Sequence, residues 1–268
     1  MKKRRFIASI LVLILLVSIV RVGWKRYEDA LRAREYEDAA RTAGLLPEPE
    51  EVTPPPSTSP PEEEAPPVPE EVRALASIDL EALRDVNPDV AGWIEIPGTE
   101  LSYPVLSGAD NQYYLTRTWT GEANSGGAIF LESTNRRDLS DFHTIVYGHR
   151  MRDGSMFGSL RNYRDSAYWR EHPAVYVAVD SGVYRYDIFS AQEVSVTGLV
   201  YRLDLETSGL EEAFIETCFE DSSLDANIVP SAEDRILTLS TCTGRGYATR
   251  WVVHGVLTGH TERKLDAA

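Results

Sequence analysis

The sequence predicts a mainly β protein whose strands close, or nearly close, into a barrel. Within residues 72–268, eight short segments are rich in β-branched and aromatic residues and are bounded by Gly, Pro, Asn or Asp, whereas only three segments show helical patterns. Apolar residues make up 43% of the 268-residue chain. That content is sufficient for a packed core and excludes a wholly disordered chain.

The N-terminal segment predicts a membrane-spanning helix over about residues 6–24, within a signal anchor formed by residues 1–26. Residues 6–20 carry no charge and separate two basic clusters, which hold all seven positive charges of the anchor. A cleaved signal peptide is the alternative, but the residues after the apolar run make a poor cleavage site. The basic N-terminus favours a cytoplasmic start, so we expect the remaining chain outside the cell membrane.

Residues 27–71 are expected to connect this anchor to the globular part. Residues 27–46 are rich in Ala, Glu and Arg and predict a helix that ends near Gly44. Its apolar face is thin, so we expect a stalk rather than a packed element. Residues 47–69 contain ten prolines and six glutamates, which is typical of an extended, acidic spacer.

Residues 72–268 are sufficient for one globular domain, which we expect to contain the barrel. The predicted strands are 92–96, 101–105, 127–131, 144–147, 174–179, 183–191, 235–240 and 249–257. The predicted helices are 78–86, 155–163 and 208–220. Asp79 or Ser77 can cap the first of these helices, and Pro88 follows its end.

Charge and cysteine content exclude several classes of function. The chain has 27 Lys and Arg against 42 Asp and Glu, so its formal net charge is −15 and no nucleic-acid partner is expected. Two cysteines are too few for a disulfide-rich scaffold or a four-cysteine zinc site. No run has the ligand spacing of a zinc or calcium site, so neither metal nor cofactor is expected.

The two cysteines lie in different contexts. Cys218 falls inside the predicted helix 208–220 and is expected to be a buried, inert thiol. Cys242 follows the predicted strand 235–240 and precedes a Gly-containing loop, where functional side chains are commonly displayed. A thiol nucleophile needs a partner that generates thiolate and a group that stabilises an oxyanion. From the residues alone, a structural role for Cys242 remains open.

Two further side chains could complete such a site. His149 follows the end of a predicted strand and begins a polar loop. Arg250 begins the last predicted strand, eight residues after Cys242, so a hairpin would bring both to one rim of the barrel. The alternatives are a surface or capping role for His149 and a solvated charge for Arg250. His254 lies between apolar residues and is expected to be structural.

Several runs of this sequence resemble sortases, especially those of class B. The opening strands of that family resemble residues 87–105 (NPDVAGWIEIPGTELSYPV), 110–115 (DNQYYL) and 127–131 (GAIFL). Its histidine, cysteine and arginine segments resemble residues 145–157 (IVYGHRMRDGSMF), 237–242 (LTLSTC) and 250–255 (RWVVHG). The likeness extends in order over about residues 78–257 and includes all three catalytic positions.

The resemblance implies a membrane-anchored cysteine transpeptidase, built as an eight-stranded sortase-type β-barrel with a few peripheral helices. Cys242 would be the nucleophile that attacks a threonine carbonyl in a sorting motif and forms a thioester. His149 would be the general acid/base, and Arg250 would be the cation beside the substrate carbonyl and its oxyanion. Family precedent also implies four residues of the substrate groove, namely Asn111, Leu115, Tyr147 and Ser240.

The implied partners are secreted proteins with a C-terminal sorting motif and an amine of peptidoglycan or its precursor. The membrane is a further partner through the N-terminal helix, with the catalytic domain outside a Gram-positive cell. One alternative is a pilin-polymerising sortase that uses a pilin lysine, although the Asp-Pro-aromatic lid motif of class C is not seen. Two others are a cysteine peptidase that only hydrolyses and a non-catalytic surface module.

Overall fold

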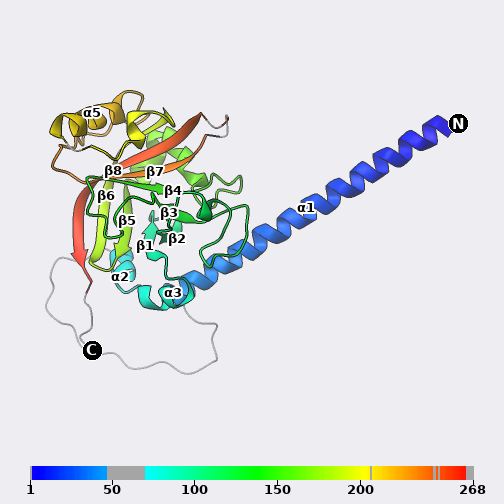
Figure 1. Cartoon of the computed structure of the whole chain (residues 1–268), viewed down its shortest axis with the longest axis horizontal. Coiled ribbons are helices and arrows are strands. Elements are labelled where there is room, and N and C mark those ends of the chain that lie inside the picture. The colour runs from blue at the N-terminus through cyan, green and yellow to red at the C-terminus, as the bar shows by residue number, and fades with distance from the viewer. Residues whose placement is uncertain (1, 47–69, 206, 244–245, 247, 264–268) are drawn as a thin grey trace, which may run out of the picture.

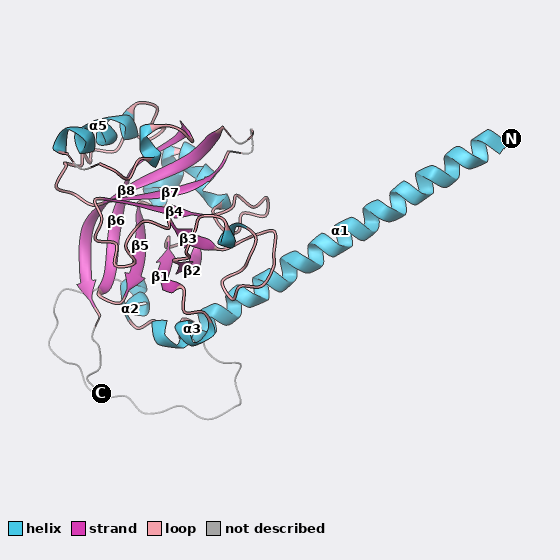
Figure 2. Ribbon diagram, viewed as in Figure 1, coloured by secondary structure: helices cyan, strands magenta, loops and turns pink. Residues whose placement is uncertain are grey.

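The computed structural model describes residues 2–46, 70–205, 207–243, 246 and 248–263 (Figure 1). These residues include eight strands that form a closed barrel in the order β1-β2-β3-β4-β7-β8-β6-β5. The strands are accompanied by a few helices at the periphery (Figure 2). The predicted fold class is therefore confirmed.

Each predicted strand has a counterpart in the structure. The strands are β1 (Val90–Glu95), β2 (Ser102–Leu106), β3 (Ile129–Leu131), β4 (His143–Tyr147), β5 (Ala174–Val179), β6 (Gly182–Ser195), β7 (Ile236–Cys242) and β8 (Thr249–Glu262). The α-helices are α1 (Lys2–Thr42), α2 (Glu70–Ala76), α3 (Leu80–Val86), α4 (Ser166–Glu171) and α5 (Ser208–Phe219). The 3₁₀ helices are η1 (Tyr113–Leu115), η2 (Gly158–Arg164) and η3 (Leu199–Tyr201). Helices α2 and α4 were not predicted, and the helix expected over 155–163 is the 3₁₀ helix η2.

The adjacent strands β4, β7 and β8 determine which side chains meet at one end of the barrel. β4 and β7 are parallel, with Tyr147 opposite Ser240. β7 and β8 are antiparallel, with Cys242 opposite Arg250, which confirms the predicted hairpin. Because side chains alternate along a strand, Ser240 and Cys242 face the same side of the sheet.

The barrel wall separates two hydrophobic cores. The larger core fills the barrel and extends beneath the N-terminal helices, and it includes Trp93 and Phe157. The smaller core includes Phe189 and Phe214 and lies where α5 covers the outer face of the barrel wall (Figure 1). Burial of each of these aromatic side chains stabilises the fold by about 1.5–3 kcal/mol. Helix α5 therefore holds one side of the wall that carries the β7–β8 hairpin.

The C-terminal part of α1 packs against the barrel and so differs from the expected stalk. Tyr36, Ala39 and Ala43 are buried and belong to the larger core, and the Arg32 side chain is buried beside them. Arg32, Tyr36 and Ala39 recur at helical spacing and therefore lie on one face of α1, and Ala43 directly follows its end. Small alanine side chains permit close approach of the helix, although they give its sequence only a thin apolar face. The N-terminal part of α1 extends away from the barrel (Figure 1).

The membrane-spanning helix predicted over about residues 6–24 forms part of the long helix α1. Within the residues that the structure describes, no helix combines the length and apolar content required to cross a membrane. The acidic spacer predicted over residues 47–69 lies outside the described residues.

The docking of α1 can be tested at Ala39, which is fully buried, against Ala30, which is exposed on the same helix. Ala39→Glu would place an unpaired carboxylate in the contact, so we expect the free energy of unfolding to fall by about 2–4 kcal/mol. Ala30→Glu should change it by less than about 0.5 kcal/mol. Urea unfolding of the full chain in detergent measures both values. Equal stability of the two variants would contradict docking.

Candidate active site

Cys242 is the last residue of β7 and is half-buried. Leu239 of the same strand joins the larger core, whereas Ile236 joins the smaller one. Cys242 lies an even number of positions after Ile236, so both side chains point to the same face of β7. Cys242 therefore faces the outer side of the barrel wall. Arg250 lies directly across the hairpin, and its Nη1 donates to the Thr249 carbonyl at 3.0 Å.

His149 reaches the same place because it follows β4, the parallel neighbour of β7. The Gly148 N–H extends the ladder by donating to the Ser240 carbonyl at 3.2 Å. Nε2 of His149 donates to the Leu115 carbonyl at 2.7 Å, which fixes the orientation of the ring. This arrangement leaves Nδ1 for the Cys242 thiol, the side chain that contributes most to the raised pKa of His149.

Gly127, in the loop before β3, makes room for the His149 ring. It adopts a φ of +60°, which residues with a side chain rarely adopt. A Cβ at this position would lie 2.9 Å from His149 Cδ2 and 2.6 Å from the Tyr114 carbonyl oxygen. Only glycine therefore allows the imidazole to approach the backbone so closely at this position.

The electrostatics of the site favour ionisation of both Cys242 and His149. The hydrogen bond with His149, aided by the positive charge of Arg250, lowers the pKa of the Cys242 thiol, although burial opposes the shift. The hydrogen bond with Cys242 raises the pKa of His149, against the effects of burial and of Arg250. The two pKa values therefore move toward each other, which favours proton transfer between thiol and imidazole.

A cavity of about 170 Å³ opens at this point. Its lining residues are Asn111, Leu115, Phe130, Tyr147, Gly148, His149, Thr241, Cys242 and Arg250. The lining includes the three predicted catalytic residues and three of the four predicted groove residues. Side chains that are far apart in the sequence thus converge on one cavity.

Glu132, which the sequence analysis missed, holds two of these lining side chains. Asn111 Nδ2 donates to its Oε1 at 2.6 Å, and the Tyr147 hydroxyl donates to its Oε2 at 2.9 Å. Burial and the nearby carboxylate raise the pKa of Tyr147, so the phenol stays protonated. The available sequence signal was that this acid directly follows the predicted strand 127–131.

Ser240 is the predicted groove residue that does not line the cavity. It is buried, and its hydroxyl forms a 2.7 Å hydrogen bond with the Tyr201 hydroxyl. Tyr201 ends η3 in the segment between β6 and β7, whose residues could not be matched to a family position from the sequence. The structure therefore places Ser240 behind the cavity, where it ties this segment to β7.

The other cysteine and two buried histidines do not line the cavity. Burial raises the pKa of Cys218, as expected of an inert thiol. His143 Nε2 and His254 Nδ1 lie 2.8 and 2.9 Å from the Thr238 hydroxyl, and burial lowers the pKa of each imidazole to about 3. Both histidines are therefore neutral near pH 7. The expected structural roles of Cys218 and His254 agree with this burial.

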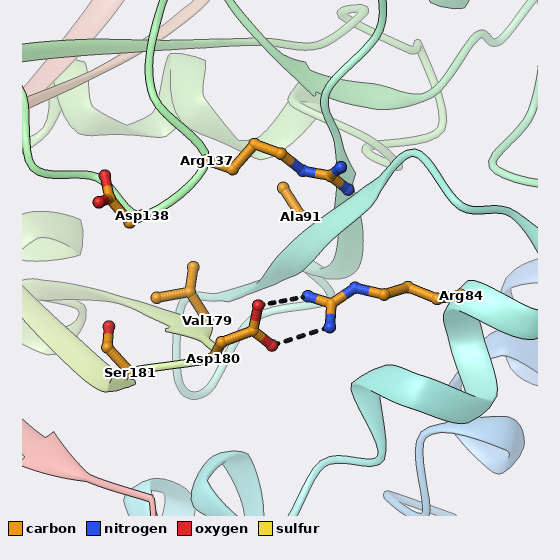
Figure 3. Close-up of a pocket in the computed structure, with 7 residues that line it drawn as sticks. All are labelled: Arg84, Ala91, Arg137, Asp138, Val179, Asp180 and Ser181. Carbon is orange, nitrogen blue, oxygen red and sulfur yellow. Dashed lines mark hydrogen bonds and ion pairs between the residues drawn. The ribbon is translucent and has the colours of Figure 1, made fainter.

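A second cavity, of about 280 Å³, is lined by charged side chains that are paired with one another or with the backbone. Figure 3 shows Asp180 facing Arg84, and the two contacts between them are 2.8 and 2.9 Å long. Arg137 donates to the carbonyls of Pro88 and Val90 at 2.9 and 2.7 Å. None of the lining residues that the structure describes is a cysteine or a histidine. Across the described residues, no cluster of three or more His, Cys, Asp or Glu side chains could hold a metal ion.

Comparison with known proteins gives concordant matches. The sortase domain model matches residues 94–258. Sortase B of Listeria monocytogenes is 36% identical over 184 residues, which cover 67% of this chain and 74% of that protein. The structure of a Staphylococcus aureus sortase B–substrate complex has a TM-score of 0.70 at 25% identity and covers 87% of this chain and 98% of that one. A Bacillus anthracis sortase B structure has a TM-score of 0.62 at 34% identity, with coverages of 68% and 83%.

The contrast between the two thiols predicts selective alkylation. In the folded chain, iodoacetamide should modify Cys242 and spare Cys218, which is buried. The pH of half-maximal labelling of Cys242 should lie below about 8.5, the value of an ordinary thiol, because its pKa is lowered. His149→Ala should raise that pH, since it removes the main cause of the shift, and Arg250→Gln should raise it less.

Pulse labelling at a series of pH values, followed by peptide mapping, measures this profile. Equal labelling of both cysteines, or a profile unchanged in His149→Ala, would contradict the arrangement.

Proposed function

This chain belongs to the sortase family of cysteine transpeptidases, in its class B, and we propose that its substrates are secreted proteins with a C-terminal sorting motif. Its acceptor is an amine of peptidoglycan or its precursor. The observation that carries this proposal is the convergence of Cys242, His149 and Arg250 on one cavity.

The first step forms a thioester on Cys242. Its thiolate attacks the carbonyl carbon of the threonine in the sorting motif, and the carbonyl oxygen becomes an oxyanion beside the Arg250 guanidinium. The imidazolium of His149 gives its proton to the nitrogen of the scissile bond, that bond breaks, and the C-terminal fragment leaves as an amine. The lowered thiol pKa and the raised imidazole pKa support this division of charge.

The second step transfers the acyl group. The acceptor amine attacks the thioester carbonyl, neutral His149 takes the proton that this nitrogen loses, and the Cys242 thiolate departs as the new amide forms. Water can attack the same thioester, with a free acid as the product. The ratio of amide to acid therefore distinguishes a transpeptidase from a peptidase that only hydrolyses.

We propose that the sorting motif lies in the cavity between Leu115 and Tyr147. Asn111 and Tyr147 present an amide and a hydroxyl whose positions are set by Glu132, and these groups suit hydrogen bonds to an extended peptide. Ser240 supports the wall from behind. The Staphylococcus aureus relative was solved as a substrate complex, which supports a substrate site on this fold.

We also propose that the N-terminal part of α1 anchors the enzyme in the cell membrane, with the barrel on the outer side. The uncharged run 6–20 between two basic clusters supports an anchor. Large apolar side chains from Ile10 to Trp24 are exposed in the structure, as expected of a lipid-facing segment. An outer location would bring the cavity to secreted proteins and to the growing cell wall.

The test of transpeptidation is the effect of an added amine. The full chain in detergent is incubated with a pool of sorting-motif peptides, with and without an acceptor amine, and the products are identified by mass spectrometry. We expect an amide product that depends on Cys242, and faster turnover as the amine concentration rises. Free acid formed at a rate independent of the amine would instead favour a hydrolase. Selective use of lysine from a pilin-derived peptide would favour the polymerising alternative.

Substitutions at the site should give a graded loss of turnover. Cys242→Ala should lower the rate at least about 1000-fold, because no nucleophile remains. Arg250→Gln should lower kcat about 100- to 1000-fold, since the oxyanion loses its cation. The matched control is Cys218→Ser, which should retain activity. Residual activity above a few per cent in Cys242→Ala would eliminate its proposed role as nucleophile.

A further inference from the structure

Helix α1 contacts three loops that surround His149. These loops are residues 116–124 after η1, the turn 126–127 before β3, and residues 150–156 after His149 itself. Each loop forms at least one side-chain contact with the stretch 32–36 of α1. The part of α1 that was expected to be a stalk therefore lies against the segments that hold the imidazole.

Arg32 connects α1 to the loop that follows His149. Its side chain is 4% exposed, and its Nη2 lies 3.3 Å from Asp153 and 3.1 Å from Asp29. The remaining Nη1 is buried without a hydrogen-bond partner among the described atoms. It lies against Gly126, where an added Cβ would be only 2.5 Å away. Arg32 thus packs closely against the turn 126–127 and forms an ion pair with Asp153.

Tyr36, one helical turn after Arg32 in α1, contacts the same turn 126–127. Its buried hydroxyl donates to the Gly127 carbonyl at 3.1 Å. The other side of Gly127 faces the His149 ring, since a Cβ there would lie 2.9 Å from Cδ2. Gly127 therefore contacts both Tyr36 and the imidazole, so a shift of this tyrosine would move the backbone against which the ring packs.

A second path leads from Tyr36 to His149 through the barrel. The Tyr36 ring packs edge-on against Tyr103 with centroids 5.1 Å apart. The Tyr103 hydroxyl accepts a hydrogen bond from Met156 N–H at 3.0 Å. The next residue, Phe157, donates its N–H to the His149 carbonyl at 3.0 Å. The backbone of His149 is thus connected to α1 as well as its ring.

Glu35 holds the loop 116–124, the remaining one of the three loops. Its carboxylate accepts from the Thr120 hydroxyl at 2.5 Å, and its backbone carbonyl accepts from Trp119 Nε1 at 3.2 Å. This loop directly follows Leu115, whose carbonyl accepts the hydrogen bond from His149 Nε2. All three elements that set the position of the imidazole therefore depend on one face of α1.

We propose that Arg32 and Tyr36 are positioning residues for His149, and that docking of α1 sets the catalytic geometry of the enzyme. This inference rests on the proposed role of His149 as general acid/base. Neither side chain touches the reacting atoms. They act by holding the turn 126–127 and the loop 150–156 against the imidazole, so that it faces the Cys242 thiol. A misplacement of about 1 Å can cost a reaction about 100-fold in rate.

The experiment uses the full chain in detergent and compares Arg32→Gln and Tyr36→Phe with the control Arg41→Gln. Arg41 lies on the same helix and is paired with Glu37 and Asp38 of that helix. We expect kcat to fall about 10- to 100-fold in Arg32→Gln and less in Tyr36→Phe, with KM for the peptide little changed. Arg41→Gln should match the unaltered chain. Arg32→Lys should recover part of the loss, since the charge opposite Asp153 remains.

The pH profile separates positioning from a general loss of stability. If His149 turns away from the thiol, the pH of half-maximal Cys242 alkylation should rise in Arg32→Gln and Tyr36→Phe but not in Arg41→Gln. A lower melting temperature with an unchanged profile and unchanged kcat would overturn the proposal. If Arg32→Gln does not fold, Tyr36→Phe and Asp153→Asn decide the question by the same readouts.

His149→Ala separates this inference from the proposed function. If that variant is inactive while the α1 variants keep full kcat and an unchanged profile, the positioning role is refuted and the proposed function stands. If His149→Ala keeps full activity, the proposed function fails and the positioning role fails with it.

Discussion

The hydrogen-bonded register of β4, β7 and β8 is the constraint on which the rest of the site depends. It places Tyr147 beside Ser240 and Cys242 opposite Arg250. A slip of one residue in either pairing would turn the side chains of one strand to the other face of the wall. The ladder continues for one more step through Gly148, so His149 leaves β4 at the level of the cysteine. Backbone geometry therefore brings the thiol, the imidazole and the guanidinium together before any side-chain interaction between them is considered.

The side chains on the outer face of β7 change from fully buried to partly solvent-exposed along the strand. Ile236, Thr238 and Ser240 are at most 2% exposed, whereas Cys242 is half-buried and lines a cavity. This gradient explains why two thiols in one domain differ in chemistry. Cys218 has only burial acting on it, and its pKa rises. Cys242 has a histidine and an arginine as neighbours, and its pKa falls despite partial burial.

Much of the fold was predictable because the strands are short, β-rich and separated by turn residues. The Cys242–Arg250 hairpin followed from an eight-residue separation, and the burial of Cys218 followed from its helical context. The roles of Tyr201 and Glu132 were not predictable, because each acts through a contact between segments far apart in the chain. Local sequence patterns do not record such contacts.

The docking of α1 shows the same limit in a different way. Its buried face consists of an arginine, a tyrosine and an alanine, so it lacks the broad apolar stripe that normally indicates a packed helix. The close approach depends equally on Gly126 and Gly127, nearly a hundred residues further along the chain. Neither segment alone indicates the contact. Close packing of Tyr36 and Ala39 in the core, the Arg32–Asp153 ion pair and the hydrogen bond of Tyr36 to Gly127 together join the helix to the barrel.

The most direct test of the central claim is detection of the acyl-enzyme. The full chain is mixed with sorting-motif peptides without an amine, quenched in acid, and examined by intact-protein mass spectrometry and peptide mapping. We expect an added mass equal to the acyl part of the accepted peptide, located on Cys242 and discharged by an acceptor amine. An adduct on another residue, or turnover of peptide in Cys242→Ala at the unaltered rate, would contradict it.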